Sequence, residues 1–139
     1  MLRLVKDVLA GYGLNIDPAE TDKDLSDIEK YFLNNRGYFA VIEKDEKIVG
    51  SYGIFHISDS SCELRKMYLL PTEQGRGYGK MMMEDAFRQA KMLGYTEMIL
   101  ETNRKLDKAI HLYIRYGFEE CQPGHLSDRC DLAMRKMLK

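Results

Sequence analysis

The chain has 139 residues and a formal net charge of -1, with 45% hydrophobic and 31% charged residues. That is enough for one globular domain with a real core and too little for a second, so we expect a single domain over residues 1–139. The near-neutral charge leaves no basic footprint for a nucleic acid, which we do not expect as a partner.

Three cysteines, Cys62, Cys121 and Cys130, are widely spaced and form no CxxC pair. This spacing argues against a disulfide framework and against a zinc site, and no two histidines have metal-ligand spacing, so we expect no metal. Charged residues interrupt the first apolar stretch, and no run approaches the length of a membrane span. We therefore expect a soluble, cytoplasmic protein without a membrane contact.

The first part of the chain has the period of helices. Apolar residues recur at helical spacing from Leu2 until Gly11, which predicts a helix over 2–11. The same spacing, with Thr21 as a capping residue, predicts a second helix over about 21–34.

The pattern then changes to that of strands. Residues 38–43 and 48–57 are rich in β-branched and aromatic residues and flank the charged turn KDEK, so they predict a hairpin. A third strand, over 62–70, ends at Pro71. The remaining helix, strand, helix and two strands are predicted over 77–93, 95–102, 106–116, about 118–121 and about 130–138.

This order of elements is typical of an α/β or α+β fold with a mixed sheet. A strand, a helix and a strand follow one another around a cluster of glycines. That unit predicts that the strands over 62–70 and 95–102 are parallel neighbours.

The glycines Gly75, Gly77 and Gly79 stand at alternate positions where the helix over 77–93 begins. A loop of this kind aims free backbone N–H groups at one point, and the positive end of the helix dipole makes that point an anion site, most readily for phosphate. Three nearby side chains can add donors: Gln74, Arg76 and Lys80. The alternative is a turn that only needs unusual dihedral angles.

Two common phosphate motifs do not fit the loop. A Walker loop needs glycine where Gln74 stands and serine or threonine where Met81 stands. A dinucleotide fingerprint needs its third glycine where Lys80 or Met82 stands. The pattern that does fit is Gln-x-x-Gly-x-Gly, beginning at Gln74.

With this pattern the chain resembles the GNAT superfamily of acyl-coenzyme A-dependent N-acetyltransferases, whose signature (R/Q)-x-x-G-x-(G/A) cradles the pyrophosphate of coenzyme A. The stretch AIHLYIRYGF, residues 109–118, resembles the second hallmark of the family, A-I-x-L-Y-x-x-x-G-F. The two motifs and their flanks cover most of residues 48–120. The resemblance implies a mixed, mostly antiparallel sheet with a central parallel strand pair, flanked by helices, and acetyl-CoA as co-substrate.

The chain departs from the family pattern at two points. Family members usually open with a strand before the first helix, whereas this chain begins almost at that helix, so the first strand is expected to be missing or differently built. Many members also carry asparagine where Leu106 stands, and Asn103 is the alternative contact for the arm of the coenzyme.

The resemblance also implies which residues hold acetyl-CoA. The pantetheine arm would pair with the backbone of the strand at 67–69, and an amide there would polarise the thioester carbonyl. The pyrophosphate would lie on the amides of 74–80. The cofactor-binding residues assigned in this way are Met67, Tyr68, Leu69, Gln74, Gly75, Arg76, Gly77, Tyr78, Gly79, Lys80 and Asn103.

Two residues match catalytic positions of the family. Tyr113 matches the general acid that protonates the departing thiolate, with a packed core tyrosine as the alternative. Glu63 lies eleven residues before Gln74, the spacing at which histone acetyltransferase members carry a general-base glutamate. The alternative is an ion pair of Glu63 with Arg65 or Lys66, and Glu101 is the second candidate base.

Residues outside these motifs carry weaker expectations. His56, His111 and His125 are expected to be structural or solvated, with His111 on the outer face of its helix, and Cys130 is expected to be a buried thiol. The loop that contains His125, Asp128 and Arg129 is a weak candidate for contact with the acceptor.

The resemblance implies an N-acetyltransferase that moves the acetyl group of acetyl-CoA to a primary amine by direct attack in a ternary complex. The acceptor, a small molecule or a peptide, stays open, and a homodimer is common among similar proteins. Two other hypotheses also stay open: a non-catalytic module that binds or senses acyl-CoA, and a nucleotide-binding protein that uses the loop for a plain phosphate.

Overall fold

Six strands form one mixed sheet in the order β1-β2-β3-β4-β6-β5. The computed structural model describes residues 2–10, 14, 23–122 and 130–138. The strands are β1 (Tyr38–Lys44), β2 (Lys47–His56), β3 (Ser61–Leu69), β4 (Glu97–Thr102), β5 (Glu119–Glu120) and β6 (Leu132–Met137), and the helices and helical turns are α1 (Leu2–Ala10), η1 (Lys23–Ser26), η2 (Glu29–Leu33), η3 (Pro71–Glu73), α2 (Tyr78–Met92) and α3 (Asp107–Arg115).

The predicted α+β class and the mixed sheet are confirmed. All neighbouring strands are antiparallel except β3 and β4, which are parallel as the strand, helix, strand unit predicted. Among the described residues no strand precedes α1, and β1 forms the edge of the sheet.

The single helix predicted over about 21–34 is replaced, in its described part, by two helical turns. Its described part contains a 3-10 turn, η1, followed by a π-helical turn, η2, in which the amide of Asn34 donates to the carbonyl of Glu29 at 2.7 Å. The Asp24 carboxylate faces inward, 4% exposed, and the Phe32 ring is fully buried. Both side chains are thus buried by a segment that is not one regular helix.

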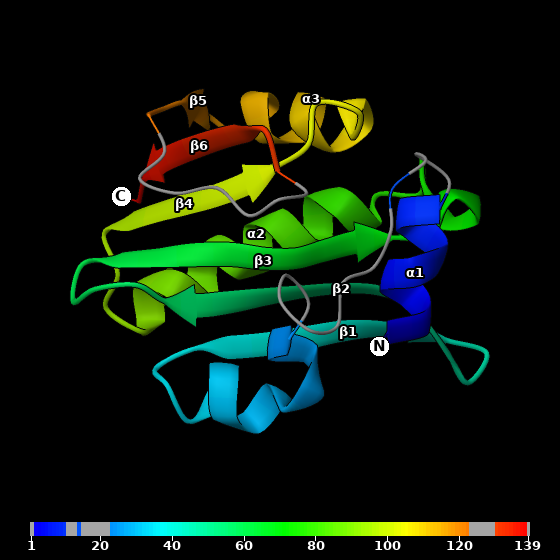
Figure 1. The fold of residues 1–139 in the computed structure, drawn as a ribbon, viewed down its shortest axis with the longest axis horizontal. Coiled ribbons are helices and arrows are strands. Elements are labelled where there is room, and N and C mark those ends of the chain that lie inside the picture. The colour runs from blue at the N-terminus through cyan, green and yellow to red at the C-terminus, as the bar shows by residue number, and fades with distance from the viewer. Residues whose placement is uncertain (1, 11–13, 15–22, 123–129, 139) are drawn as a thin grey trace.

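The helices cover both faces of the sheet, and Figure 1 shows α1 in front of the sheet and α2 behind it. Behind, the buried methionines and alanines of α2 pack with Tyr52 and Ile54 of β2, Leu64 of β3 and Phe118 in the main core. In front, Leu4 and Val8 of α1 form a smaller cluster with Val49 and Leu70. Alternate residues of each strand therefore belong to opposite layers.

The parallel pair at the centre of the sheet is short. β3 and β4 are paired from Ser61 with Glu97 to Glu63 with Ile99, and no pair is formed beyond Glu63 although β3 continues to Leu69. The second half of β3 therefore runs on beyond its ladder with β4. This is the position of the candidate site.

Candidate active site

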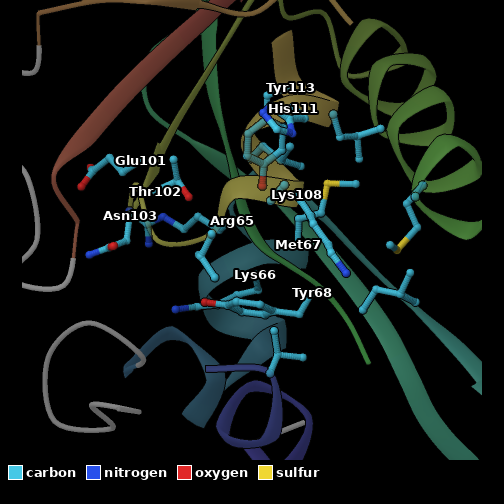
Figure 2. Close-up of a pocket in the computed structure, with 18 of the residues that line it drawn as sticks. Arg65, Lys66, Met67, Tyr68, Glu101, Thr102, Asn103, Lys108, His111 and Tyr113 are labelled. Carbon is cyan, nitrogen blue, oxygen red and sulfur yellow. The ribbon is translucent and has the colours of Figure 1, made fainter. Parts of the chain in front are cut away.

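A cleft of about 570 Å³ opens where β3 and β4 cease to pair. Figure 2 shows side chains of β3, including Arg65, Lys66 and Tyr68, around the same space as Glu101 at the end of β4 and Tyr113 of α3. The predicted site residues that line the cleft are Glu63, Met67, Tyr68, Leu69, Gln74, Gly75, Gly79, Asn103 and Tyr113, together with the second candidate base Glu101.

One end of the cleft is the glycine loop, residues 74–80. Gly75 and Gly77 have φ values of +79° and +87°, in the left-handed region that favours glycine, and a Cβ at either position would meet no atom within 4 Å. Gly79 lies close to α3, because a Cβ there would stand 3.3 Å from Cδ2 of Leu112. Two glycines therefore shape the loop, and the third lets α3 approach it.

Backbone donors collect at the same loop. The first hydrogen bond of α2 runs from the amide of Met81 to the carbonyl of Gly77, at 3.1 Å, so the amides of residues 78–80 precede the helical ladder. The Gln74 side chain donates to the carbonyl of Leu69 at 3.4 Å, which ties the loop to the end of β3. An anion at this point would meet unused N–H groups and the positive end of the α2 dipole.

The other predicted residues of the loop lie at its rim. Gly77, Tyr78, Lys80 and Arg76 are not among the residues that line the cleft. The Arg76 guanidinium is more than half exposed and faces Glu73 at 3.7 Å, and Glu73 also accepts a hydrogen bond from Lys44 at 2.8 Å. These two cations offset the acidic side chain next to the loop.

β3 contains a bulge beside the cleft that the sequence did not reveal. Arg65 pairs with Gly53 of β2 and Tyr68 pairs with Ser51, so β3 has one more residue than β2 between these pairs. Lys66 has a φ value of +56°, an uncommon conformation for a residue with a side chain. The bulge lies where the predicted pantetheine contacts of Met67 and Tyr68 begin.

Beside the bulge lies a group of ionisable side chains, called here the charged cluster: Asp24, Glu63, Arg65, Lys66 and Glu101. The Asp24 carboxylate is 3.3 Å from the Arg65 guanidinium and 3.2 Å from the Lys66 ammonium. Arg65 also donates a hydrogen bond to Glu63 and stacks on the Phe55 ring, 3.5 Å from its centroid. Asp24, Glu63 and Lys66 are all less than 10% exposed.

The surroundings of Glu63 combine features of a base and of an ion-paired carboxylate. Burial raises the pKa of its carboxyl above the ordinary value, the Arg65 guanidinium opposes this rise, and the Glu101 carboxyl, which shares a hydrogen bond with Glu63, adds to it. Of the two ion pairs considered for Glu63 from the sequence, the pair with Arg65 is present. The Lys66 ammonium faces Asp24 instead.

Tyr113 reaches the cleft from α3, where its ring packs edge-on against Phe118 with centroids 5.8 Å apart. The side chain is 6% exposed. Burial raises the pKa of the Tyr113 phenol well above its ordinary value, and the nearby Tyr68 and Cys130 add to this effect. The phenol therefore keeps its proton at neutral pH, as a proton donor must.

Several other expectations have mixed outcomes. His111, expected on the outer face of its helix, is exposed but lines the cleft, and Cys130, expected to be buried, is partly exposed and lines it too. Asn103 accepts a hydrogen bond from the amide of Lys105 at 2.9 Å, and Leu106 contributes an apolar wall. His125, Asp128 and Arg129 lie outside the described residues.

Sequence reasoning missed Asp24 and Ser51. Asp24 lies 41 residues before the arginine that it pairs with, and Ser51 donates to the carbonyl of Lys66 from the neighbouring strand. Neither residue belongs to a motif. One signal pointed to Asp24: it shares a helical face with the apolar residues Ile28 and Phe32 in the helix expected over 21–34.

Among the residues that the structure describes, no group of three His, Cys, Asp or Glu side chains could hold a metal ion. None of the described helices is both long and apolar enough to cross a membrane.

The chain resembles known sequences over most of its length. The model of the acetyltransferase (GNAT) family matches residues 5–118. The uncharacterized N-acetyltransferase YjgM of Escherichia coli (strain K12) is 33% identical over 146 residues, covering 98% of this chain and 86% of that protein. Human N-acetyltransferase 8 is 33% identical over 103 residues, covering 70% of this chain, which therefore spans only 45% of that protein.

Solved structures share the same fold. A GNAT acetyltransferase from Staphylococcus aureus Mu50 superposes with a TM-score of 0.88 at 24% identity, covering 98% of this chain and 91% of that chain. The PaiA N-acetyltransferase of Thermoplasma acidophilum, in complex with coenzyme A, superposes with a TM-score of 0.72 at 19% identity, covering 98% and 92%. Because the family model matches residues 5–118 and YjgM is 33% identical over nearly the whole chain, the chain belongs to the GNAT family of acetyltransferases.

Proposed function

We propose that the protein transfers the acetyl group of acetyl-CoA to a primary amine by direct attack. The observation that carries this proposal is the cleft itself, which has a glycine loop at one end and Glu63 and Tyr113 in its walls. Membership of the family supports acetyl transfer in general. The coenzyme A bound to the Thermoplasma acidophilum relative supports the choice of donor.

The residues of the cleft fit acetyl-CoA in shape and chemistry. The glycine loop, with open space where the Cβ atoms of Gly75 and Gly77 would be, suits a pyrophosphate on the amides of 78–80. The edge of β3 from Met67 to Leu69 suits the peptide-like pantetheine arm, because the ladder with β4 ends at Glu63 and these residues line the cleft. A backbone amide near the bulge would polarise the thioester carbonyl.

Acetyl-CoA supplies an activated acyl group, whose C–S bond breaks as the C–N bond to the amine forms. Glu63 accepts the proton that the amine loses, and its raised pKa makes it a better base than an ordinary carboxylate. Tyr113 donates its phenolic proton to the departing sulfur. The products are an acetamide and coenzyme A, and solvent then exchanges protons with both side chains.

We also propose that the acceptor is an amine of a small molecule or a peptide. It would reach the thioester from the side of the charged cluster, where Glu63 and Glu101 lie. The carboxylates there suit an ammonium that must first bind and then lose a proton.

The test is release of coenzyme A from acetyl-CoA across a broad panel of amines, with purified wild type, Tyr113→Phe and Tyr116→Phe. Tyr116 is a matched control, because it lies on the next turn of the chain and contacts the Phe87 ring rather than the cleft. We expect at least one amine to be acetylated, with turnover about a hundredfold lower in Tyr113→Phe alone. Acetyl-CoA binding without any turnover would contradict the proposal and favour a non-catalytic acyl-CoA module.

A further inference from the structure

The bulge of β3 is held from the β2 side by Ser51. The Ser51 hydroxyl donates to the carbonyl of Lys66 at 2.7 Å, and Ser51 is fully buried. At this point the ladder between β2 and β3 is interrupted, so the hydroxyl supplies the donor that a regular strand would take from backbone.

From the front of the sheet the bulge is held by Asp24. Consecutive side chains of a regular strand point to opposite faces. The extra residue of the bulge changes this alternation, so that Arg65 and Lys66 both reach the one Asp24 carboxylate, at 3.3 and 3.2 Å. The left-handed conformation of Lys66 is unfavourable for a residue with a Cβ, and such a conformation persists only where its surroundings hold it.

The held segment forms part of the cleft wall. Lys66, Met67 and Tyr68 all line the cleft, and they lie beyond the last pair that β3 forms with β4, at Glu63. Arg65, which Asp24 binds, also donates to Glu63. The Asp24 carboxylate thus contacts Lys66 of the bulge directly and reaches the proposed base, Glu63, through Arg65.

We propose that Asp24 and Ser51 are positioning residues, which fix the Lys66 bulge and thereby hold the backbone at Met67 for the thioester carbonyl of acetyl-CoA. The proposal rests on the proposed function and adds to it. Neither residue needs to touch acetyl-CoA: Ser51 acts through the carbonyl of Lys66, and Asp24 acts through the side chains of Arg65 and Lys66.

The experiment is isotope-edited infrared spectroscopy of acetyl-CoA labelled with ¹³C at the thioester carbonyl, bound to wild type, Asp24→Asn, Ser51→Ala and the control Asp27→Asn. Asp27 lies on the same segment but is exposed, and its carboxylate accepts only a local hydrogen bond from the Lys30 amide among the contacts described. A hydrogen bond from an amide lowers the carbonyl stretching frequency, so this readout needs no acceptor amine.

We expect the stretch of bound acetyl-CoA to lie below that of the free thioester in wild type and Asp27→Asn, and to return toward the free value in Asp24→Asn and Ser51→Ala. Binding of plain coenzyme A, which has no carbonyl at sulfur, should change little in any variant. With an amine from the panel, turnover should fall about ten- to a hundredfold in the two bulge variants.

A lowered stretch that is the same in all four proteins would overturn this inference and leave the proposed function intact. No binding of acetyl-CoA to wild type would overturn both. If Asp24→Asn does not fold, Ser51→Ala decides alone, because it removes a hydroxyl without leaving a charge unpaired. Loss of thermal stability in that variant with an unchanged stretch and unchanged turnover would assign Ser51 a structural role only and contradict the proposal.

Discussion

The two ends of the cleft are built in different ways. The glycine loop consists of consecutive residues whose backbone groups do the binding, and it is largely exposed with open space around Gly75 and Gly77. The charged cluster consists of buried and half-buried side chains from η1, β3 and β4, with ion pairs between residues 41 positions apart in the sequence. A backbone site depends on the conformation of its residues, whereas a buried charged site depends on each charged partner.

This difference predicts that the glycine loop governs the binding of the coenzyme and that the charged cluster governs the chemical step. Changes in the glycine loop should alter the affinity for acetyl-CoA and coenzyme A together. Changes in the charged cluster should alter turnover, pH dependence and stability, with little effect on affinity.

The largest effect is expected from Glu63→Gln, which keeps the size of the side chain and removes the proton acceptor. Turnover should fall about 10²- to 10⁴-fold, while the Kd for acetyl-CoA stays within about twofold. Steady-state kinetics and calorimetry measure the two quantities. Glu84→Gln, an exposed change on α2, is the control. An equal loss of affinity and turnover in Glu63→Gln would show that the charged cluster also governs the binding of acetyl-CoA, which contradicts the predicted separation of binding from chemistry.

Asp24→Asn should have the next largest effect, on stability. The change leaves the buried Lys66 ammonium without the carboxylate that it faces, so we expect a loss of about 3 kcal/mol in the free energy of unfolding. Adding Lys66→Met should restore part of that loss, because the buried charge is then gone. Urea denaturation provides the values. Full stability of Asp24→Asn would mean that the ion pairs contribute little to the fold.

A smaller effect is expected on the pH profile from Glu101→Gln. The Glu101 carboxyl raises the pKa of Glu63, so its removal lowers that pKa and keeps Glu63 deprotonated to lower pH. The acidic limb of the profile of kcat/KM should therefore move to lower pH. Arg65→Met should move it the other way, because the Arg65 guanidinium lowers the pKa of Glu63. If the acidic limb of the kcat/KM profile stays at the same pH in both variants, Glu63 is not the base that titrates in this range.

The same contrast explains what could be predicted from the sequence. Gly75 and Gly77 could be predicted because a positive φ selects glycine. Glu63 could be predicted because its spacing in sequence from Gln74 matches the family pattern. The parallel pair followed from the order of elements. The ion pairs of Asp24, in the segment expected as a helix over 21–34, could not be predicted, because they depend on strand register, which local periodicity does not encode.

The bulge of β3 could not be predicted from the sequence either. It arises where β2 and β3 differ by one residue between paired positions, and no residue type marks that difference. Lys66 is a poor choice for a left-handed conformation, so propensity pointed away from it. Positions whose role depends on contacts between distant strands thus became visible only in the folded chain.

The central claim is that the cleft binds acetyl-CoA with its pyrophosphate on the glycine loop. Calorimetric titration of acetyl-CoA into wild type, Gly77→Glu and Gly77→Gln tests it most directly, because the two variants share size and backbone strain at a φ of +87° and differ in charge. We predict micromolar binding to wild type, about −8 kcal/mol, and a loss in Gly77→Glu that exceeds that in Gly77→Gln by about tenfold or more. No binding to folded wild type, or equal binding to all three, would contradict the account.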